Sequence, residues 1–151
     1  MYIHLFAMNG SSLPALPCLC ATLRRSSRAL TQHYDEALRP LGLRATQFTV
    51  LQALQQTGEI SQGKLGQILS MDSTTLTRTL EIMLQHGWVA KRRGKDRREW
   101  RLRLAQAGTA QLDRALPVWQ KVQARLRQKL GAVRWNSLFH LTNEVTSAVT
   151  E

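Results

Sequence analysis

The chain has 151 residues, with 21 Lys or Arg against 10 Asp or Glu, which gives a formal net charge of +11 and an isoelectric point of 11.0. This length favours one domain with a real core and is too short for a binding domain joined to an independent enzyme. The positive charge favours an anionic partner, either nucleic acid or an anionic membrane, because each cation placed near a phosphate releases a condensed counterion.

The first segment, residues 1–17, is expected to be a flexible arm because Pro14 and Pro17 discourage helix. It lacks the basic leader and long apolar core of a signal peptide, and no run reaches the ~18 apolar residues of a membrane span. We therefore expect a cytoplasmic protein with no membrane partner. The two cysteines, Cys18 and Cys20, are too few for a disulfide framework and agree with a reducing compartment.

Three helices are expected after this arm. An apolar stripe at helical spacing begins near Leu19 and ends at Pro40-Leu41-Gly42, where proline and glycine break the helix. A second helix is expected over 46–56. A third covers Lys64 to Leu69, with Ser61 as its N-cap, because a hydroxyl there accepts a bond from an otherwise unpaired amide.

A fourth helix, for which Asp72 is a natural N-cap, carries the most informative pattern in the chain. Its apolar face must be buried and comprises Leu76, Leu80, Met83 and Leu84. The opposite face has short hydroxyl side chains near the helix N-terminus and one arginine a turn later. Such a face can approach a groove of nucleic acid closely, while the helix dipole favours phosphate, although a merely solvated face is the alternative. The DNA contacts predicted from this region are Ser61, Lys64, Ser73, Thr74, Thr75, Thr77 and Arg78.

A basic hairpin follows this helix. Trp88-Val89-Ala90 is expected to form a short strand, Lys91 to Arg98 a turn too charged to bury, and Trp100 to Leu104 a returning strand with a period of two. A helix pair followed by a basic hairpin is the layout of a winged helix-turn-helix. In that layout one helix fits a DNA major groove and the hairpin reaches a neighbouring groove.

The tip of the hairpin is predicted to be a second DNA contact. Asp96 is expected to orient Arg98 within the turn, and Arg97 and Arg98 then project from the tip. Arginine at such a tip suits the narrow, electronegative minor groove. A charged, solvated turn without a partner is the alternative.

The C-terminal part is expected to form a long helix over 106–130 and, after Gly131, a second helix with an apolar stripe. That stripe comprises Trp135, Leu138, Phe139, Thr142, Val145 and Val149. Exposed aromatic residues on a terminal helix are a liability for a monomer. A partner subunit would turn the stripe into a core, and packing within one chain is the alternative.

Three motifs together resemble the multiple-antibiotic-resistance-regulator (MarR) family of bacterial repressors. They are the run Asp72 to Arg78, the corner Gly87-Trp88-Val89, and Asp96-Arg97-Arg98 followed by Leu104 and Gly108. The resemblance covers Cys18 to the C-terminus. It departs from the family at Ala105, where a threonine usually begins the next helix, so we expect a weaker cap there.

The resemblance implies a mainly α fold with a small β-hairpin wing and dimerisation helices at both ends. The expected organisation is an arm over 1–17 and a single domain over 18–151. Within the domain, 18–42 and 106–151 would serve dimerisation and 46–104 would form the winged helix-turn-helix. The expected partners are a second copy of the chain and double-stranded DNA. Two recognition helices would meet successive major grooves about 34 Å apart, which demands a pseudo-palindromic site.

Cys20 begins a run to Thr31 that is similar to the segment holding the peroxide-sensing cysteine in the organic-hydroperoxide branch of the family. That chemistry needs a thiolate, because the deprotonated sulfur attacks the peroxide to give a sulfenic acid. Arg24, one helical turn beyond Cys20, would stabilise the thiolate. Tyr34 matches one of the tyrosines that hydrogen-bond this cysteine in that branch, whereas Arg24 and Ala45 stand where two others are expected.

Other interpretations of the sensing residues stay open. Cys18 and Cys20 can be inert thiols, or either can bond a thiol of the partner chain. The histidines show no spacing suited to zinc, so no metal and no cofactor are expected. The family also responds to small aromatic or anionic effectors in a cleft between the dimer helices and the winged domain. Candidates for lining such a cleft are Arg24, His33 and Trp119.

The sequence carries no motif of an enzyme: it has no nucleotide-binding loop and no hydrolase or zinc-protease signature. We therefore predict a sequence-specific DNA-binding regulator, a homodimeric repressor released by oxidation or by a small molecule. The alternative is a sequence-independent architectural or ribosome-associated nucleic-acid binder. The two differ in the ratio of specific to non-specific affinity, roughly 10³ or more for an operator and near one for an architectural role.

Overall fold

The computed structural model describes residues 17–150, so the arm expected over 1–17 lies outside the described residues except for its last residue. The described chain is mainly helical and carries a small antiparallel sheet, as the sequence predicts. The elements in chain order are α1 (Leu19–Leu38), the 3-10 helix η1 (Arg39–Leu41), α2 (Ala45–Thr57), β1 (Ile60–Ser61), α3 (Gln62–Leu69), α4 (Ser73–Gln85), β2 (Val89–Arg93), β3 (Trp100–Leu104), α5 (Gln106–Leu130) and α6 (Ala132–Thr150).

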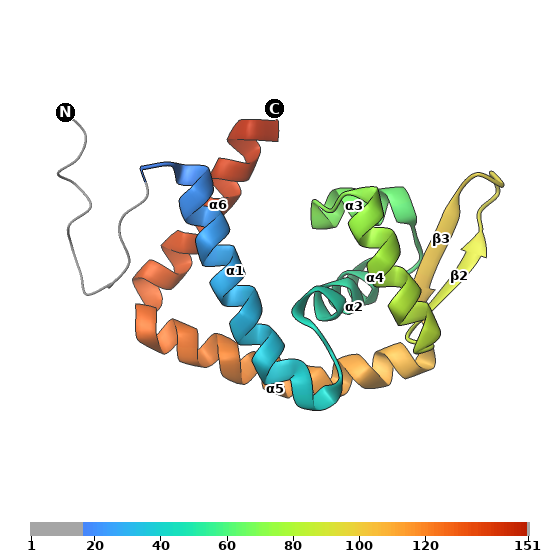
Figure 1. The fold of residues 1–151 in the computed structure, drawn as a ribbon, viewed down its shortest axis with the longest axis horizontal. Helices are drawn as coiled ribbons and strands as arrows, with labels where there is room; N and C mark the ends of the chain where they lie inside the picture. The colour runs from blue at the N-terminus through green and yellow to red at the C-terminus, as the bar shows by residue number, and fades with distance from the viewer. Residues whose placement is uncertain (1–16, 151) are drawn as a thin grey trace.

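Figure 1 shows two ends joined by one long helix. Helices α2, α3 and α4 and the sheet gather at one end, which we call the winged part (residues 45–104). Helices α1 and α6 gather at the other end, which we call the helical end. Helix α5 runs along both and contacts α1, α2, α6 and β3.

Proline and glycine end α1 where the sequence predicts a break. The helix stops at Leu38, Pro40 lies in η1, and Gly42 adopts a left-handed conformation with φ of 66°. Glycine reaches this conformation without the steric cost that a Cβ would add. The chain can therefore turn sharply from the helical end into α2.

The hydrophobic core lies mainly in the winged part and continues along α5. The predicted apolar face of α4 is confirmed: Leu76, Leu80 and Met83 are buried, and Leu84 is half-buried and packs against the core. Helix α5 adds Leu112 and Ala115 to the same cluster. Other buried members are Leu38, Leu43, Phe48, Val50, Leu51, Leu54, Leu65, Trp88, Val89 and Leu102.

The sheet has the strand order β1-β3-β2 and is antiparallel throughout. Two predictions about it need correction. Strand β1, which pairs Ile60 with Leu102, is too short to give an alternating pattern in sequence and was not predicted. Strand β2 covers Val89–Arg93 and leaves a shorter turn than the expected Lys91 to Arg98. Charge does not prevent this stretch from forming a strand, because its cationic side chains find partners on the sheet.

The first turn of α5 packs tightly against Trp88, which lies between α4 and β2. Ala105 makes no side-chain cap, in agreement with the sequence prediction. The Ala105 amide instead donates to the Trp88 carbonyl at 3.0 Å. A Cβ built on Gly108 would lie 1.9 Å from that same carbonyl oxygen. Glycine at this position lets the first turn of α5 approach the backbone of the winged part.

Helix α6 buries none of its described residues within the chain. The side chains of the predicted apolar stripe are exposed or half-buried, with Leu138 at 42% and Phe139 at 51% of full exposure. At the opposite end of the chain Leu19 is 60% exposed. The stripe is therefore present as predicted, and packing within one chain does not cover it.

Candidate nucleic-acid interface

Side-chain caps fix the N-termini of α3 and α4. The Ser61 hydroxyl accepts a bond from the Lys64 amide at 3.2 Å, and the Asp72 carboxylate accepts one from the Thr75 amide at 2.9 Å. The Thr75 hydroxyl also donates to Asp72, at 2.6 Å. These bonds hold the pKa of Asp72 below its ordinary value, with the hydroxyl of Thr75 as the largest cause. Both predicted caps are confirmed.

The polar face of α4 points away from the core. Ser73, Thr74, Thr75 and Arg78 are all exposed. The Thr75 hydroxyl donates to Asp72, so Thr75 stabilises the N-terminus of α4 in addition to forming part of its surface. The face keeps small side chains at its N-terminal end, which permits a close approach of a groove.

Thr77 has a different place from the one expected for a DNA contact. Its hydroxyl accepts a bond from Nε2 of Gln62 at 3.1 Å, and its side chain is half-buried between α3 and α4. This bond connects the two helices of the helix-turn-helix. Gln62, which no local pattern in the sequence indicates, therefore supports the packing of α3 against α4.

The wing turn over 94–99 is held by main-chain and side-chain bonds. The Gly94 amide donates to the Glu99 carbonyl at 2.8 Å, and the Asp96 carboxylate accepts from the Arg98 amide at 2.9 Å. Asp96 thus orients Arg98 through the backbone rather than through its guanidinium. Arg97 and Arg98 are exposed, as the sequence predicts for groups that project from the tip.

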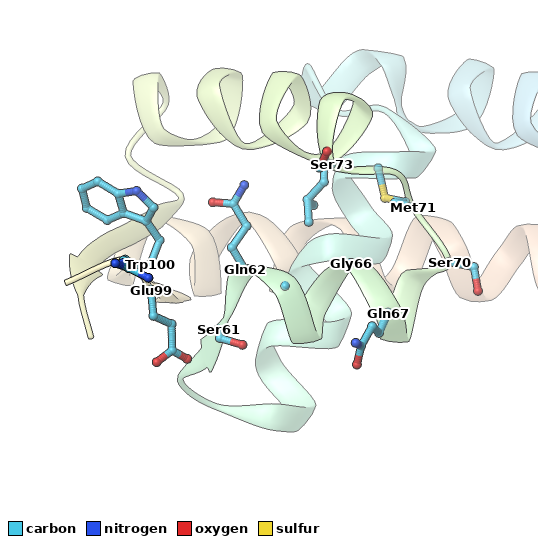
Figure 2. Close-up of a pocket in the computed structure, with 12 residues that line it drawn as sticks. Ser61, Gln62, Gly66, Gln67, Ser70, Met71, Ser73, Glu99 and Trp100 are labelled. Carbon is cyan, nitrogen blue, oxygen red and sulfur yellow. The ribbon is translucent and has the colours of Figure 1, made fainter. Parts of the chain in front are cut away.

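A groove of about 770 Å³ lies between the wing and the helix pair. Figure 2 shows Gln62 and Gly66 of α3, Ser73 of α4 and Trp100 of the wing around it. Arg98 also lines the groove. The predicted contacts Ser61, Ser73 and Arg98 therefore face a common space, while Lys64 is exposed on α3.

Arg78 lies on the other side of α4. It lines a smaller cavity of about 240 Å³ together with Arg44, Gln47 and Ile82. Two grooves therefore flank α4, one towards the wing and one towards the start of α2. Arg44 adds a cation that sequence reasoning did not single out, because 34 positions separate it from Arg78.

Several wing cations are engaged within the protein. Lys91 Nζ lies 4.2 Å and the Arg93 guanidinium carbon 3.8 Å from the centre of the Trp100 ring. Arg92 and Arg101 both bond the carboxylate of Glu59. The wing's basic residues therefore divide into a group that braces the sheet and a group that projects from the turn.

The predicted sensing residues lie on α1 and around its start. Cys18 and Cys20 are exposed free thiols, and Nη2 of Arg24 lies 3.4 Å from Sγ of Cys20. Tyr34 is half-buried, and burial raises the pKa of its phenol. Tyr34 follows Cys20 by 14 positions on the same helix, an axial separation of about 21 Å. Within one chain, Cys20 therefore contacts Arg24 but lies too far from Tyr34 to bond it.

The three candidates for an effector cleft are not gathered around either cavity described above. Arg24 and His33 are exposed on α1. Trp119 of α5 is half-buried and lies 5.9 Å from the ring centre of Phe48. Among residues 17–150, no group of three His, Cys, Asp or Glu side chains is placed to hold a metal ion. No helix in this described range combines the length and apolar character needed to span a bilayer.

Comparisons with known proteins agree with this geometry. Residues 43–100 match the MarR family. The chain is 34% identical over 77 residues to the HTH-type transcriptional regulator YwoH of Bacillus subtilis (strain 168), a match that covers 51% of this chain and only 56% of YwoH. It is 31% identical over 101 residues to the organic hydroperoxide resistance transcriptional regulator of the same organism, covering 66% of this chain and 69% of that protein.

A solved structure extends the similarity to nearly the whole described chain. The M. tuberculosis transcriptional regulator MosR, crystallised in complex with DNA, superposes with a TM-score of 0.74 at 36% sequence identity. The superposition covers 87% of this chain and 98% of that chain.

Proposed function

Because this chain belongs to the MarR family, we propose that it is a sequence-specific DNA-binding transcriptional regulator that acts as a homodimeric repressor on a pseudo-palindromic operator. Residues 46–104 would bind DNA, and residues 18–42 and 106–151 would hold the dimer together. In this proposal the chain acts by binding rather than by catalysis, and a regulator of chromosomal genes would act in the cytoplasm.

The observation that carries this proposal is the groove between α4 and the wing. Ser73 of α4 and Arg98 of the wing turn both line it. This arrangement suits one helix in a major groove and the wing in the adjacent minor groove, with the phosphate backbone between them. The net charge of +11 supplies the attraction.

The dimer is supported by the apolar side chains that the helical end leaves uncovered. Leu138, Phe139 and Leu141 of α6 are 42–56% exposed, and the stripe continues to Val149. A second copy that covers both α6 and α1 would remove this surface from water. Two recognition helices on one rigid dimer would then be separated by about one helical turn of DNA.

The direct test is a titration of the purified protein with its own upstream DNA and with scrambled DNA of equal length at physiological salt. The proposal predicts a ratio of affinities of roughly 10³ or more. A ratio near one would instead favour the architectural alternative, because an architectural protein uses the same charge without a chosen sequence.

We further propose that oxidation of Cys20 releases the operator. Nη2 of Arg24 donates to the Cys20 sulfur at 3.4 Å, and a peroxide attacked by this sulfur would convert it to a sulfenic acid. The exposure of Cys20 gives an oxidant access. Tyr34 could reach this cysteine only across the dimer, since about 21 Å separates the two on one helix.

The release proposal is tested by Cys20→Ser, with Cys18→Ser as its matched control. The Cys20 variant should bind operator like the parent and stay bound when mild organic hydroperoxide is added. Release of the variant by oxidant would show that Cys20 is not the sensor. A parent protein indifferent to oxidant would favour a small aromatic or anionic effector, with Arg24, His33 and Trp119 as the first residues to vary.

A further inference from the structure

Glu59 connects the three strands of the sheet through its carboxylate. It precedes β1, and its Oε2 accepts a bond from Nε of Arg92 in β2 at 2.8 Å. Its Oε1 accepts from Nε of Arg101 in β3 at 3.0 Å, and Nη2 of Arg92 also donates to Oε1. Nη2 of Arg101 donates to the Glu59 carbonyl at 3.2 Å. We call Glu59, Arg92 and Arg101 the acid clamp.

The register of the sheet explains why an acid is needed here. Arg92 lies directly opposite Arg101 in the β2–β3 pair, and like charges in directly opposed positions destabilise a hairpin. Glu59 supplies a counter-charge that both arginines share, and Oε1 of Glu99 accepts a further bond from Nη1 of Arg101 at 3.3 Å. The bonds from Arg92 and Arg101 hold the pKa of Glu59 below its ordinary value, so the carboxylate is ionised at neutral pH.

The clamp lies at the base of the turn that carries the exposed arginines. Arg92 is the fourth residue of β2, and the turn over 94–99 follows that strand directly. On the other face of the hairpin, Lys91 and Arg93 lie on the Trp100 ring, and Nη1 of Arg93 donates to the Arg97 carbonyl at 2.7 Å. Both faces of the hairpin are thus braced while Arg97 and Arg98 stay exposed.

We propose that Glu59 is a positioning residue for DNA recognition: it sets the angle of the wing, and so the reach of Arg97 and Arg98, without contacting DNA itself. The inference rests on the proposed function, since it assigns the wing a role in operator binding. It also assigns Arg92 and Arg101 to the support of the sheet, although sequence alone groups them with the other wing cations.

The proposal makes a prediction opposite to that of simple electrostatics. Removal of an acid from a DNA-binding surface should strengthen binding to every sequence, because one repulsive charge is lost and Arg92 loses its carboxylate partner, while Arg101 keeps Glu99. A clamp predicts weaker binding to the operator, where the wing must be placed correctly. It allows equal or stronger binding to scrambled DNA, where placement matters little.

The experiment compares Glu59→Gln with the parent and with Asp113→Asn, which makes the same charge change at an exposed acid of α5. Affinities for operator and scrambled DNA are measured at one salt concentration. Amide hydrogen exchange of the free proteins is followed across the turn, where the Gly94 and Glu99 amides are bonded. We expect Glu59→Gln to bind operator about fivefold more weakly and its turn amides to exchange about tenfold faster, with α4 and α5 unchanged.

A second variant separates positioning from loss of charge. In Glu59→Gln/Arg92→Gln the opposed positive charges are no longer both present, so turn protection and operator affinity should recover part of the loss. Operator binding by Glu59→Gln that equals or exceeds the parent's, with unchanged exchange, would overturn the proposal. A parent that does not distinguish the two DNAs would contradict the proposed function instead, and the exchange data would then decide whether the clamp holds the wing.

Discussion

The winged part and the helical end bury their apolar side chains in different ways. In the winged part, Leu76, Leu80, Met83 and Leu102 are at most 2% exposed within a single chain. At the helical end, α6 buries none of its described residues, and Phe139 is 51% exposed although it contacts Trp135 edge to face at a ring-centre distance of 5.1 Å. The winged part buries its apolar side chains within its own chain, whereas the helical end leaves them uncovered, as the proposed dimer requires.

This difference predicts that the stabilities of the two ends depend differently on protein concentration. Contacts within the winged part should resist unfolding to the same degree at any protein concentration. In the proposed dimer, the uncovered surfaces of α1 and α6 would contact a second subunit, so stability at the helical end should rise with protein concentration. Helix α5 connects the two ends, so a change at the proposed dimer interface would be transmitted to the spacing of the two α4 helices.

The largest expected effect is at Gly108, where the winged part meets α5. Gly108→Ala places a Cβ 1.9 Å from the Trp88 carbonyl oxygen, a backbone atom that cannot rotate away. We expect a loss on the order of 3–5 kcal/mol in the free energy of unfolding, independent of protein concentration, measured by urea denaturation. The control is Gly63→Ala in α3, where a Cβ meets nothing within 4 Å and helix propensity should add about 0.5–1 kcal/mol. Equal stability of Gly108→Ala and the parent would contradict the close packing described here.

The next largest effect, a loss of dimer affinity, is expected at Phe139 in the helical end. Phe139→Asp puts a charge into the surface that a partner subunit should cover, so dimer affinity should fall by about 2–4 kcal/mol. Sedimentation velocity at several concentrations would measure this shift towards monomer, and circular dichroism would check that the winged part stays folded. Ser147→Asp adds the same charge to an exposed polar position of α6 on the side away from the apolar stripe and should leave the dimer intact. Unchanged sedimentation of Phe139→Asp would place the dimer interface elsewhere.

A smaller effect is expected at the wing tip. Arg98→Ala should weaken operator binding by about 1–3 kcal/mol without changing the fold or the dimer. Lys129→Ala, which removes an exposed cation from the far end of α5, should have little effect at the same salt concentration. The comparison between the two ends fails if both substitutions weaken binding equally, because charge alone would then account for it.

The smallest effect is expected at the cap of α4. The folded-state pKa of Asp72 is lowered, so its carboxylate stabilises the fold at pH values above its ordinary pKa of 3.8, and that contribution is lost as the pH falls below it. Asp72→Asn should therefore lose less stability than the parent between about pH 5 and pH 3, as measured by thermal unfolding. Glu59 contributes with the same sign, so part of the acid sensitivity should remain. Identical pH profiles for variant and parent would remove Asp72 from this account.

Local patterns predicted most of the fold. The caps at Ser61 and Asp72 and the buried face of α4 follow from residues within one or two turns of each other, which periodicity reports directly. Partners distant in sequence were not predictable in this way. Glu59 bonds arginines 33 and 42 positions later, and nothing near Glu59 in the chain indicates them.

The wing shows why composition alone misleads about a site. A run of cations from Lys91 to Arg98 was expected to be a solvated turn, yet Lys91 and Arg93 lie on Trp100 and belong to a strand. Thr77 is predicted as a DNA contact from its position on α4, and its hydroxyl also accepts a bond from Gln62 of α3. In both cases a polar side chain contacts another residue of the same chain, and the three-dimensional structure is needed to identify that residue.

In the proposed dimer, α4 and the wing of each subunit bind DNA together. Hydroxyl-radical footprinting of the parent protein and of Arg98→Ala on the operator would reveal this arrangement. We expect a two-fold symmetric pattern whose halves are centred about one helical turn apart, with flanking minor-groove protection that Arg98→Ala loses. Uniform protection without symmetry, or flanking protection that Arg98→Ala keeps, would show that α4 and the wing do not bind in this way.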